Sequence, residues 1–147
     1  MRGTAEPVAM ELFDPCTVVP DEAIRAAGAD PASLEQGPST ESGKWKHCTW
    51  TAPDYYLNIS VTTRRIGELE SNPNYVDVVG TEVPGRRGSL EYSIAPDSRD
   101  QMCVVASPWS GGSITVMINR KQSAAATRQP CLLAGQAARI VSPTLPN

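Results

Sequence analysis

Alternating apolar and polar positions predict a run of strands in the middle of the chain. Between residues 55 and 63, large apolar side chains recur at every second position, at Tyr55, Leu57, Ile59 and Val61. A period of two is typical of a strand with one buried face. Similar alternation, or a short apolar run between turn residues, predicts further strands over residues 45–51, 76–83, 90–94, 102–106 and 113–119. Because short turns join most of these segments, we expect the strands to pair antiparallel.

Capping residues predict helical structure before the strands. Asp14 followed by Pro15 is a favourable helix start, because the carboxylate accepts unpaired backbone N–H groups and proline has none to offer. Residues 21–27 have acidic side chains in their first turn and are followed by Gly28, a common helix stop. The segment before the strands therefore contains a short helix.

The remaining segments predict a C-terminal helix and a long loop. Residues 129–141 place their larger apolar side chains on one helical face, and Pro143 follows. Residues 66–71 predict one or two helical turns. Residues 29–44 are rich in Pro, Gly, Ser and Glu, which favours a loop.

These elements predict an α+β fold. The 147 residues are 40% hydrophobic and 20% charged, which is too apolar and too weakly charged for a disordered chain. No run of about 18 apolar residues predicts a membrane span. We expect a single antiparallel sheet of about six strands, with a short N-terminal helix and a C-terminal helix packed on it. Residues 1–12 are interpreted as a linker or tether, 13–143 as the domain and 144–147 as a tail.

Four cysteines, Cys16, Cys48, Cys103 and Cys131, stand at long spacings. Neither a structural zinc site nor a thioredoxin-like motif is expected, because both use close cysteine pairs. Two disulfides or four buried thiols remain, and four cysteines allow three connectivities. We favour Cys16 with Cys48 and Cys103 with Cys131, because this pairing closes the two shortest loops. Each bridge would stabilise the folded state by roughly 3–4 kcal/mol. Disulfides indicate an oxidising compartment outside the cytoplasm.

Candidate catalytic groups form no recognisable set. The single histidine, His47, is interpreted as a surface strand residue, because the neighbouring Cys48 is assigned to a disulfide and points to the other face. No serine stands in a nucleophile-elbow motif. Paired carboxylates could serve a hydrolase, and the local clusters are Glu68 with Glu70, and Glu91 with Asp97 and Asp100. We expect no catalytic residue, no cofactor and no metal, and read these acids as solvated charge.

A ligand or partner surface is predicted at Arg86, Arg87 and Trp109. Arginine pairs can grip anionic groups, and a tryptophan can line a pocket. The groove between the sheet and the loop over residues 29–44 is the other candidate. The formal net charge of −3 argues against a nucleic-acid partner.

Three motifs resemble a known family. They are Asp14-Pro15-Cys16 before a short helix, Cys48-Thr-Trp50 on the first predicted strand, and Cys103 followed by Cys131 in the last helix. Together they resemble the actinobacterial lipoprotein domain family catalogued as domain of unknown function 3558. The resemblance implies an exported protein held on the outer face of the cytoplasmic membrane by a lipidated N-terminal cysteine, and it implies no activity. This chain carries no lipobox, so we expect either a form from which the anchor has been removed or a member that is tethered in another way.

The sequence therefore predicts an extracytoplasmic cell-envelope binding or interaction module of a secreted or lipid-anchored protein. We expect a monomer close to the membrane whose partner is a small ligand, a glycan or lipid, or an envelope protein. The alternatives are a purely structural accessory lipoprotein and a hydrolase that uses carboxylates.

Overall fold

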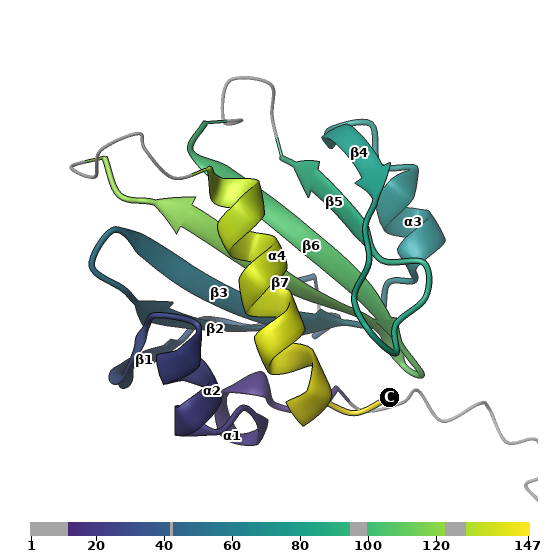
Figure 1. The fold of residues 1–147 in the computed structure, drawn as a ribbon. Coiled ribbons are helices and arrows are strands. Elements are labelled where there is room, and N and C mark those ends of the chain that lie inside the picture. The colour runs from purple at the N-terminus through teal and green to yellow at the C-terminus, as the bar shows by residue number, and fades with distance from the viewer. Residues whose placement is uncertain (1–11, 42, 95–99, 123–128) are drawn as a thin grey trace, which may run out of the picture.

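A computed structural model describes residues 12–41, 43–94, 100–122 and 129–147. One antiparallel sheet forms its centre, with the strand order β1-β2-β3-β7-β6-β5-β4 (Figure 1). The strands are β1 (Asp30–Gln36), β2 (Trp45–Thr51), β3 (Tyr55–Thr62), β4 (Val76–Gly80), β5 (Leu90–Ser93), β6 (Met102–Trp109) and β7 (Gly112–Arg120). The helices are α1 (Pro15–Val18), α2 (Asp21–Ala26), α3 (Ile66–Glu70) and α4 (Pro130–Val141), followed by the 3-10 turn η2 (Ser142–Thr144). The predicted α+β fold with one antiparallel sheet is confirmed.

The alternation of β3 builds the main core. Leu57 lies opposite Trp50 of β2 and Ile118 of β7, and Ile59 lies opposite Cys48 and Val116. Leu57, Ile59 and Ile118 are completely buried. Since side chains on one face recur every two residues, these positions form one apolar face, which we call the packed face.

Helix α4 covers the packed face, and α1 and α2 extend this layer toward β1 and β2 (Figure 1). Pro130 begins α4, where its missing N–H costs nothing. Small side chains on the buried side, such as Ala134 and Ala137, allow the helix to approach the strands closely. The predicted C-terminal helix is therefore confirmed.

The N-terminal segment forms two short helices, where the sequence predicted one. Asp14 caps α1 by accepting a 2.9 Å hydrogen bond from the backbone N–H of Cys16. Helix α2 ends as predicted at Gly28, whose φ is +91°. A Cβ there would collide with the hydroxyl of Tyr55, which donates to Ala27 O at 2.5 Å. Glycine is thus required at this position both for its backbone angle and for space.

The sheet has seven strands rather than six, because β1 lies within the segment predicted as a loop. Asp30 pairs with Thr51 and Gln36 with Cys48, with an irregular register between them. No residue of β1 is buried on either face, so the strand has no alternation that a sequence could reveal. Pro31 is tolerated because β1 is an edge strand, where the missing backbone N–H of proline does not interrupt the hydrogen bonds between strands.

Two disulfides fasten the helical layer to the packed face. Cys16 of α1 bonds to Cys48 of β2, and Cys103 of β6 bonds to Cys131 of α4. Both predicted pairings are confirmed.

Packing continues beyond the predicted domain boundaries. Leu12, the last residue of the proposed linker, and Leu145, within the proposed tail, both belong to the main core. Residues 1–11 lie outside the described residues. Within the part that is described, no helix combines the length and apolar character needed to cross a membrane.

Candidate functional site

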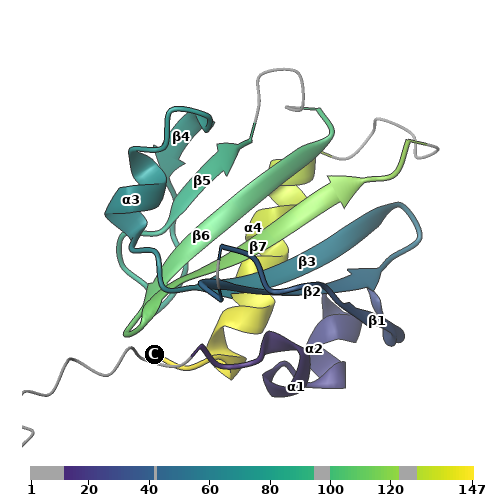
Figure 2. The same cartoon turned by 180° about the vertical axis from the view of Figure 1, so that it is seen from behind.

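The face of the sheet opposite α4, which we call the open face, is only partly covered. In the reverse view, α3 lies over the β4–β5 side, whereas no helix of the described residues lies over β2, β3 and β7 (Figure 2). Leu69 of α3 joins a second, smaller apolar cluster with Tyr92 of β5 and Val104 of β6. The side chains of β3 that face this way include Asn58 and Ser60, so the uncovered half is polar.

A groove lies on the open face where its polar and apolar halves meet. It has a volume of about 300 Å³, within the range of small-ligand sites. Its floor comes from β3, β7 and β6, and its sides come from β2, the segment before β2, and the β4–β5 region. The lining residues are Thr40, Glu41, Trp45, His47, Asn58, Ser60, Tyr75, Tyr92, Ile94, Val104, Thr115 and Met117.

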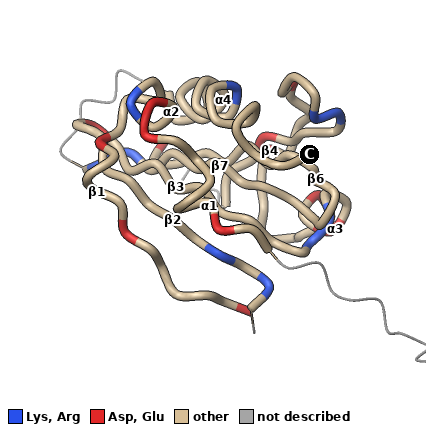
Figure 3. The backbone as a smooth tube through the Cα atoms, turned by 90° about the horizontal axis from the view of Figure 1, so that it is seen from below, with Lys and Arg blue, Asp and Glu red and all other residues tan. Residues whose placement is uncertain are grey.

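A second hollow adjoins this groove. It has a volume of about 400 Å³ and shares Glu41, Trp45 and Tyr75 with the first. Viewed from below, the chain that leads into β2 lies on the side of the sheet away from α4 (Figure 3). This segment supplies Thr40 and Glu41, so it forms one wall. Of the described residues in the segment predicted as a loop over residues 29–44, only Thr40 and Glu41 line the groove, and residues 30–36 are strand β1.

A chain of hydrogen bonds crosses the floor of the groove. Thr40 Oγ1 lies 3.0 Å from His47 Nε2, and His47 Nδ1 lies 2.7 Å from Ser60 Oγ. Ser60 donates to Asn58 Oδ1 at 2.7 Å, and Asn58 Nδ2 donates to Thr49 Oγ1 at 2.9 Å. The chain joins β2, β3 and the segment before β2 into one fixed surface.

The direction of these bonds defines the state of His47. Ser60 has one hydroxyl hydrogen and gives it to Asn58, so His47 Nδ1 carries the proton that bonds to Ser60 Oγ. Nε2 is then the acceptor for the hydroxyl of Thr40. Partial burial lowers the pKa of His47, which keeps the ring neutral. With its proton already given to Asn58, Ser60 is not arranged as a nucleophile activated by His47.

Two pairs of stacked rings line the groove. Trp45 and His47 are nearly parallel, with ring centroids 5.7 Å apart, and Tyr75 stacks on Tyr92 at 4.3 Å. Burial raises the pKa of Tyr92 well above its usual range, and the neighbouring Tyr75 adds to this, so the phenol stays neutral. The stacking fixes the orientation of each ring.

An ion-pair network holds the wall of the groove beside Trp45. Arg64 binds Glu41 at 2.5 Å and Glu68 at 3.1 Å, and Trp45 Nε1 donates to Glu41. Hydrogen bonds from Arg64 and then Trp45 lower the pKa of Glu41. The backbone N–H of Arg65 and then the side chain of Arg64 lower the pKa of Glu68. Glu41 also has a left-handed backbone, with φ of 51°, so its contacts hold an uncommon conformation in place.

Of the residues predicted as a ligand surface, Arg86 and Arg87 line one hollow of about 640 Å³, and Trp109 is not part of its lining. Arg86 is 5% exposed, and its guanidinium donates to Ser142 Oγ at 2.6 Å and to the carbonyl oxygens of Pro108, Ser142 and Leu145 at 3.0–3.1 Å. Trp109 is 7% exposed and packs edge-on against Phe13. Only Arg87 of the three is exposed. Arg86 and Trp109 therefore hold the C-terminal and N-terminal segments onto the sheet instead of facing solvent.

Of the predicted carboxylate clusters, the structure places Glu68 in an ion pair and Glu91 beside a disulfide. Glu68 is bound to Arg64, and its pKa is lowered, whereas a general acid needs a raised pKa. Glu91 lies beside the Cys103–Cys131 disulfide. Asp97 lies outside the described residues.

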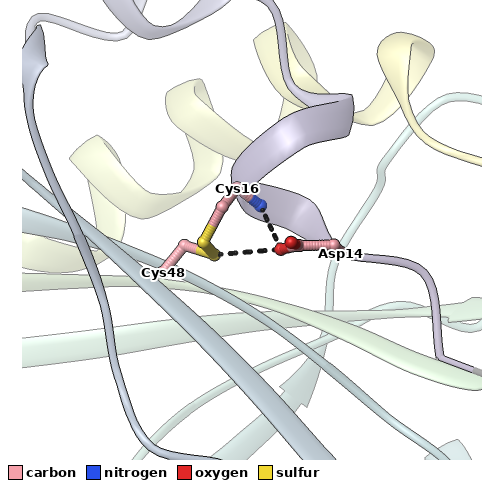
Figure 4. Close-up of side chains that lie close together, drawn as sticks. All are labelled: Asp14, Cys16 and Cys48. Carbon is pink, nitrogen blue, oxygen red and sulfur yellow. Dashed lines mark hydrogen bonds between the residues drawn. A yellow bond between two sulfur atoms is a disulfide. The ribbon is translucent and has the colours of Figure 1, made fainter.

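Two groups of side chains have the spacing of metal ligands, and in both the sulfur atoms are already bonded. One is Asp14 with Cys16 and Cys48 (Figure 4). Asp14 Oδ1 accepts a hydrogen bond from the backbone N–H of Cys16 and lies 3.8 Å from Cys48 Sγ. A disulfide sulfur is not a thiolate, so neither this group nor Glu91 with Cys103 and Cys131 offers a sulfur ligand. The Asp-Pro-Cys motif instead caps α1 and fastens it to β2.

Residues 3–144 match the family described as "Protein of unknown function (DUF3558)". The chain belongs to this family, and the resemblance seen in its motifs is confirmed. Comparison with curated proteins and with solved structures finds no match.

Sequence reasoning missed the groove residues, although one signal was present. His47 was interpreted as a surface residue, and it is half-buried in a hydrogen-bond network. On β3, Asn58, Ser60 and Thr62 form an unbroken polar alternate row, which is normal for a solvated face. Ser60 and Thr62 are nevertheless almost fully buried, at 2% and 0% exposed. A polar row that is buried indicates a structured surface.

Proposed function

We propose that this protein is an extracytoplasmic binding module that holds a small ligand in the groove of the open face. The observation that carries the proposal is the groove itself, in which ordered aromatic rings stand over a fixed polar floor. Binding sites commonly combine a largely apolar lining with a few oriented polar groups. Helices α1, α2 and α4 cover the packed face, whereas the groove on the open face is accessible.

The two disulfides support a location outside the cytoplasm. Both pairs are formed, and both fasten short or terminal helices that a reducing compartment would leave unlinked. The charged residues of both signs are spread around the described parts of the fold without a one-sided basic stretch (Figure 3), which fits the net charge of −3 and argues against a nucleic-acid partner.

The groove supports binding better than catalysis. Both ring nitrogens of His47 and the hydroxyl hydrogen of Ser60 are committed to the floor network. The acids that line the site, Glu41 and Glu68, are bound to Arg64. His47, Ser60 and the two acids are thus used to hold the shape of the site.

Intact mass measured under native, non-reducing conditions tests this proposal. We expect a chain that is lighter by four hydrogens than the reduced form and that carries an adduct through purification from its exporting host. The adduct should be lost when Trp45→Ala is made and retained in Tyr56→Ala. Tyr56 is a matched control because it is an exposed aromatic residue of the same face outside the groove lining. Four free thiols would contradict the location, and an adduct unaffected by Trp45→Ala would contradict the site.

A further inference from the structure

The lining of the two adjoining hollows carries three formal charges, and they neutralise one another in part. Arg64 stands between Glu41 and Glu68, at 2.5 and 3.1 Å. Among the described residues, no unpaired cation lines either hollow, and the paired charges leave a slight negative excess. A phosphate or carboxylate ligand would meet no complementary charge here, so the site favours an uncharged ligand.

Two aromatic side chains stand where the hollows meet. Trp45 and Tyr75 line both hollows, so a ligand that extends from one to the other passes them. Each is backed by a second ring, His47 behind Trp45 and Tyr92 behind Tyr75. Rings that are already held in place lose little freedom when they receive a flat, partly apolar ligand.

The polar groups of the floor retain unused hydrogen-bonding capacity. Thr115 is 6% exposed and lies beside Ser60 in the sheet register, and its hydroxyl has no hydrogen bond to other described residues. Asn58 Nδ2 has two hydrogens, and the bond to Thr49 uses one. In the second hollow, Asn72 accepts a backbone bond through Oδ1, which leaves its amide hydrogens for a ligand. Neutral hydroxyl and amide groups in this arrangement suit a ligand that carries several hydroxyls.

We infer that the groove binds an uncharged saccharide of one or two rings. A pyranose ring has a C–H face that stacks on an aromatic side chain and a rim of hydroxyls that can both donate and accept. The floor spans the three strands β3, β7 and β6, so the outer two are roughly 10 Å apart, which suits a sugar ring with its substituents. The inference rests on the proposed binding function and specifies the ligand class.

An acyl chain fits the same surface less well. The apolar part of the lining, such as Val104 and Met117, would accept methylene groups. An acyl chain would also cover Asn58 and Thr115 without pairing their remaining polar atoms, and such burial is unfavourable. A saccharide satisfies these atoms and still covers the aromatic rings.

Isothermal titration calorimetry and saturation-transfer NMR on the full, disulfide-bonded chain test the inference. The probes are maltose, cellobiose and N,N′-diacetylchitobiose as neutral saccharides, glucose 6-phosphate as an anionic sugar, and indole and 1-decanol as neutral molecules without a hydroxylated ring. We expect at least one neutral disaccharide to bind, with saturation transfer to its ring C–H protons, and glucose 6-phosphate to bind at least about tenfold more weakly.

Single-residue variants test whether saccharides bind in the groove. Trp45→Ala and the nearly isosteric Thr115→Val should each weaken saccharide binding by about tenfold, because one removes a stacking surface and the other a single hydroxyl. Tyr56→Ala should leave it unchanged. Circular dichroism and thiol counting show whether each variant is folded and has its disulfides. If Trp45→Ala does not fold, Thr115→Val still tests the site.

Two results would overturn the inference in different ways. If indole or 1-decanol binds in a Trp45-dependent manner and no neutral saccharide binds up to about 20 mM, the ligand class is wrong and the binding function stands. If none of the probes binds and the purified chain carries no adduct, both the ligand class and the binding function are wrong.

Discussion

The packed and open faces are made by the same strands, and they differ in what their side chains contact. On the packed face, Leu57, Ile59 and Ile118 are fully buried under α4. On the open face, their neighbours Asn58 and Ser60 bind His47 and Thr49 through a chain of hydrogen bonds. The packed face obtains its stability from apolar area, whereas the open face holds polar groups in fixed positions. Because apolar packing on one face supplies the stability, the side chains of the other face can vary with little cost to the fold.

The largest expected contrast is between two adjacent residues of β3. Leu57→Ala should lower the free energy of unfolding by about 3–5 kcal/mol, because it opens a cavity at a completely buried position. Asn58→Ala should lower it by about 1 kcal/mol, because its side chain is only half-buried and loses hydrogen bonds next to solvent. Urea denaturation under non-reducing conditions measures both. Equal decreases in the free energy of unfolding for the two variants would contradict the conclusion that the packed face supplies most of the stability.

The Cys103–Cys131 disulfide should have the next largest effect. The double variant Cys103→Ala with Cys131→Ala should lose about 2–4 kcal/mol of stability, because the unfolded chain is no longer constrained and α4 is held by packing alone. The bridge lies on the packed face, so binding in the groove should be retained below the melting temperature. Thermal denaturation and calorimetry check the two parts. An unchanged melting temperature under oxidising conditions would show that the bridge contributes nothing.

The smallest effect is a pH dependence on the open face. Burial lowers the pKa of His47 in the folded protein, so at mildly acidic pH the unfolded chain binds more protons than the folded one. The stability contributed by the neutral ring is therefore fully present above its unfolded pKa of about 6.5 and is lost as the pH falls through the lower folded value.

His47→Asn is the control for this dependence, because an asparagine amide can still donate to Ser60 and does not titrate. Between about pH 7 and pH 5, wild-type stability should fall more steeply than that of the variant. Parallel urea titrations at several pH values measure the difference. Identical slopes for the two proteins would mean that His47 protonates freely in the fold.

Much of the fold could be predicted from local signals. The alternation around Leu57 places β3, the Asp14-Pro15 pair begins α1, and Gly28 ends α2. The cysteine spacings favoured the pairing that the structure contains. These features could be predicted because each depends on a few neighbouring residues or on loop length.

The burial of individual residues and the lining of the candidate site depend on contacts between distant segments. Arg86 and Arg87 are alike in sequence, yet Arg86 is buried against the C-terminal segment and Arg87 is exposed. Trp45, His47 and Tyr75 become one lining only because the segment before β2 and the region before β4 meet over the sheet. Strand β1 forms because β2 offers a free edge. No local sequence pattern predicts these contacts between distant segments.

The sequence by itself thus determined the class of fold, the helix limits that depend on caps, the disulfide pairing and the family. Only the tertiary structure decided which polar residues are ordered, which arginine is buried, and that the two halves of the open face enclose a groove. The physical reason is that caps and alternation act over a few residues. A binding surface arises where residues far apart in the chain exclude water together.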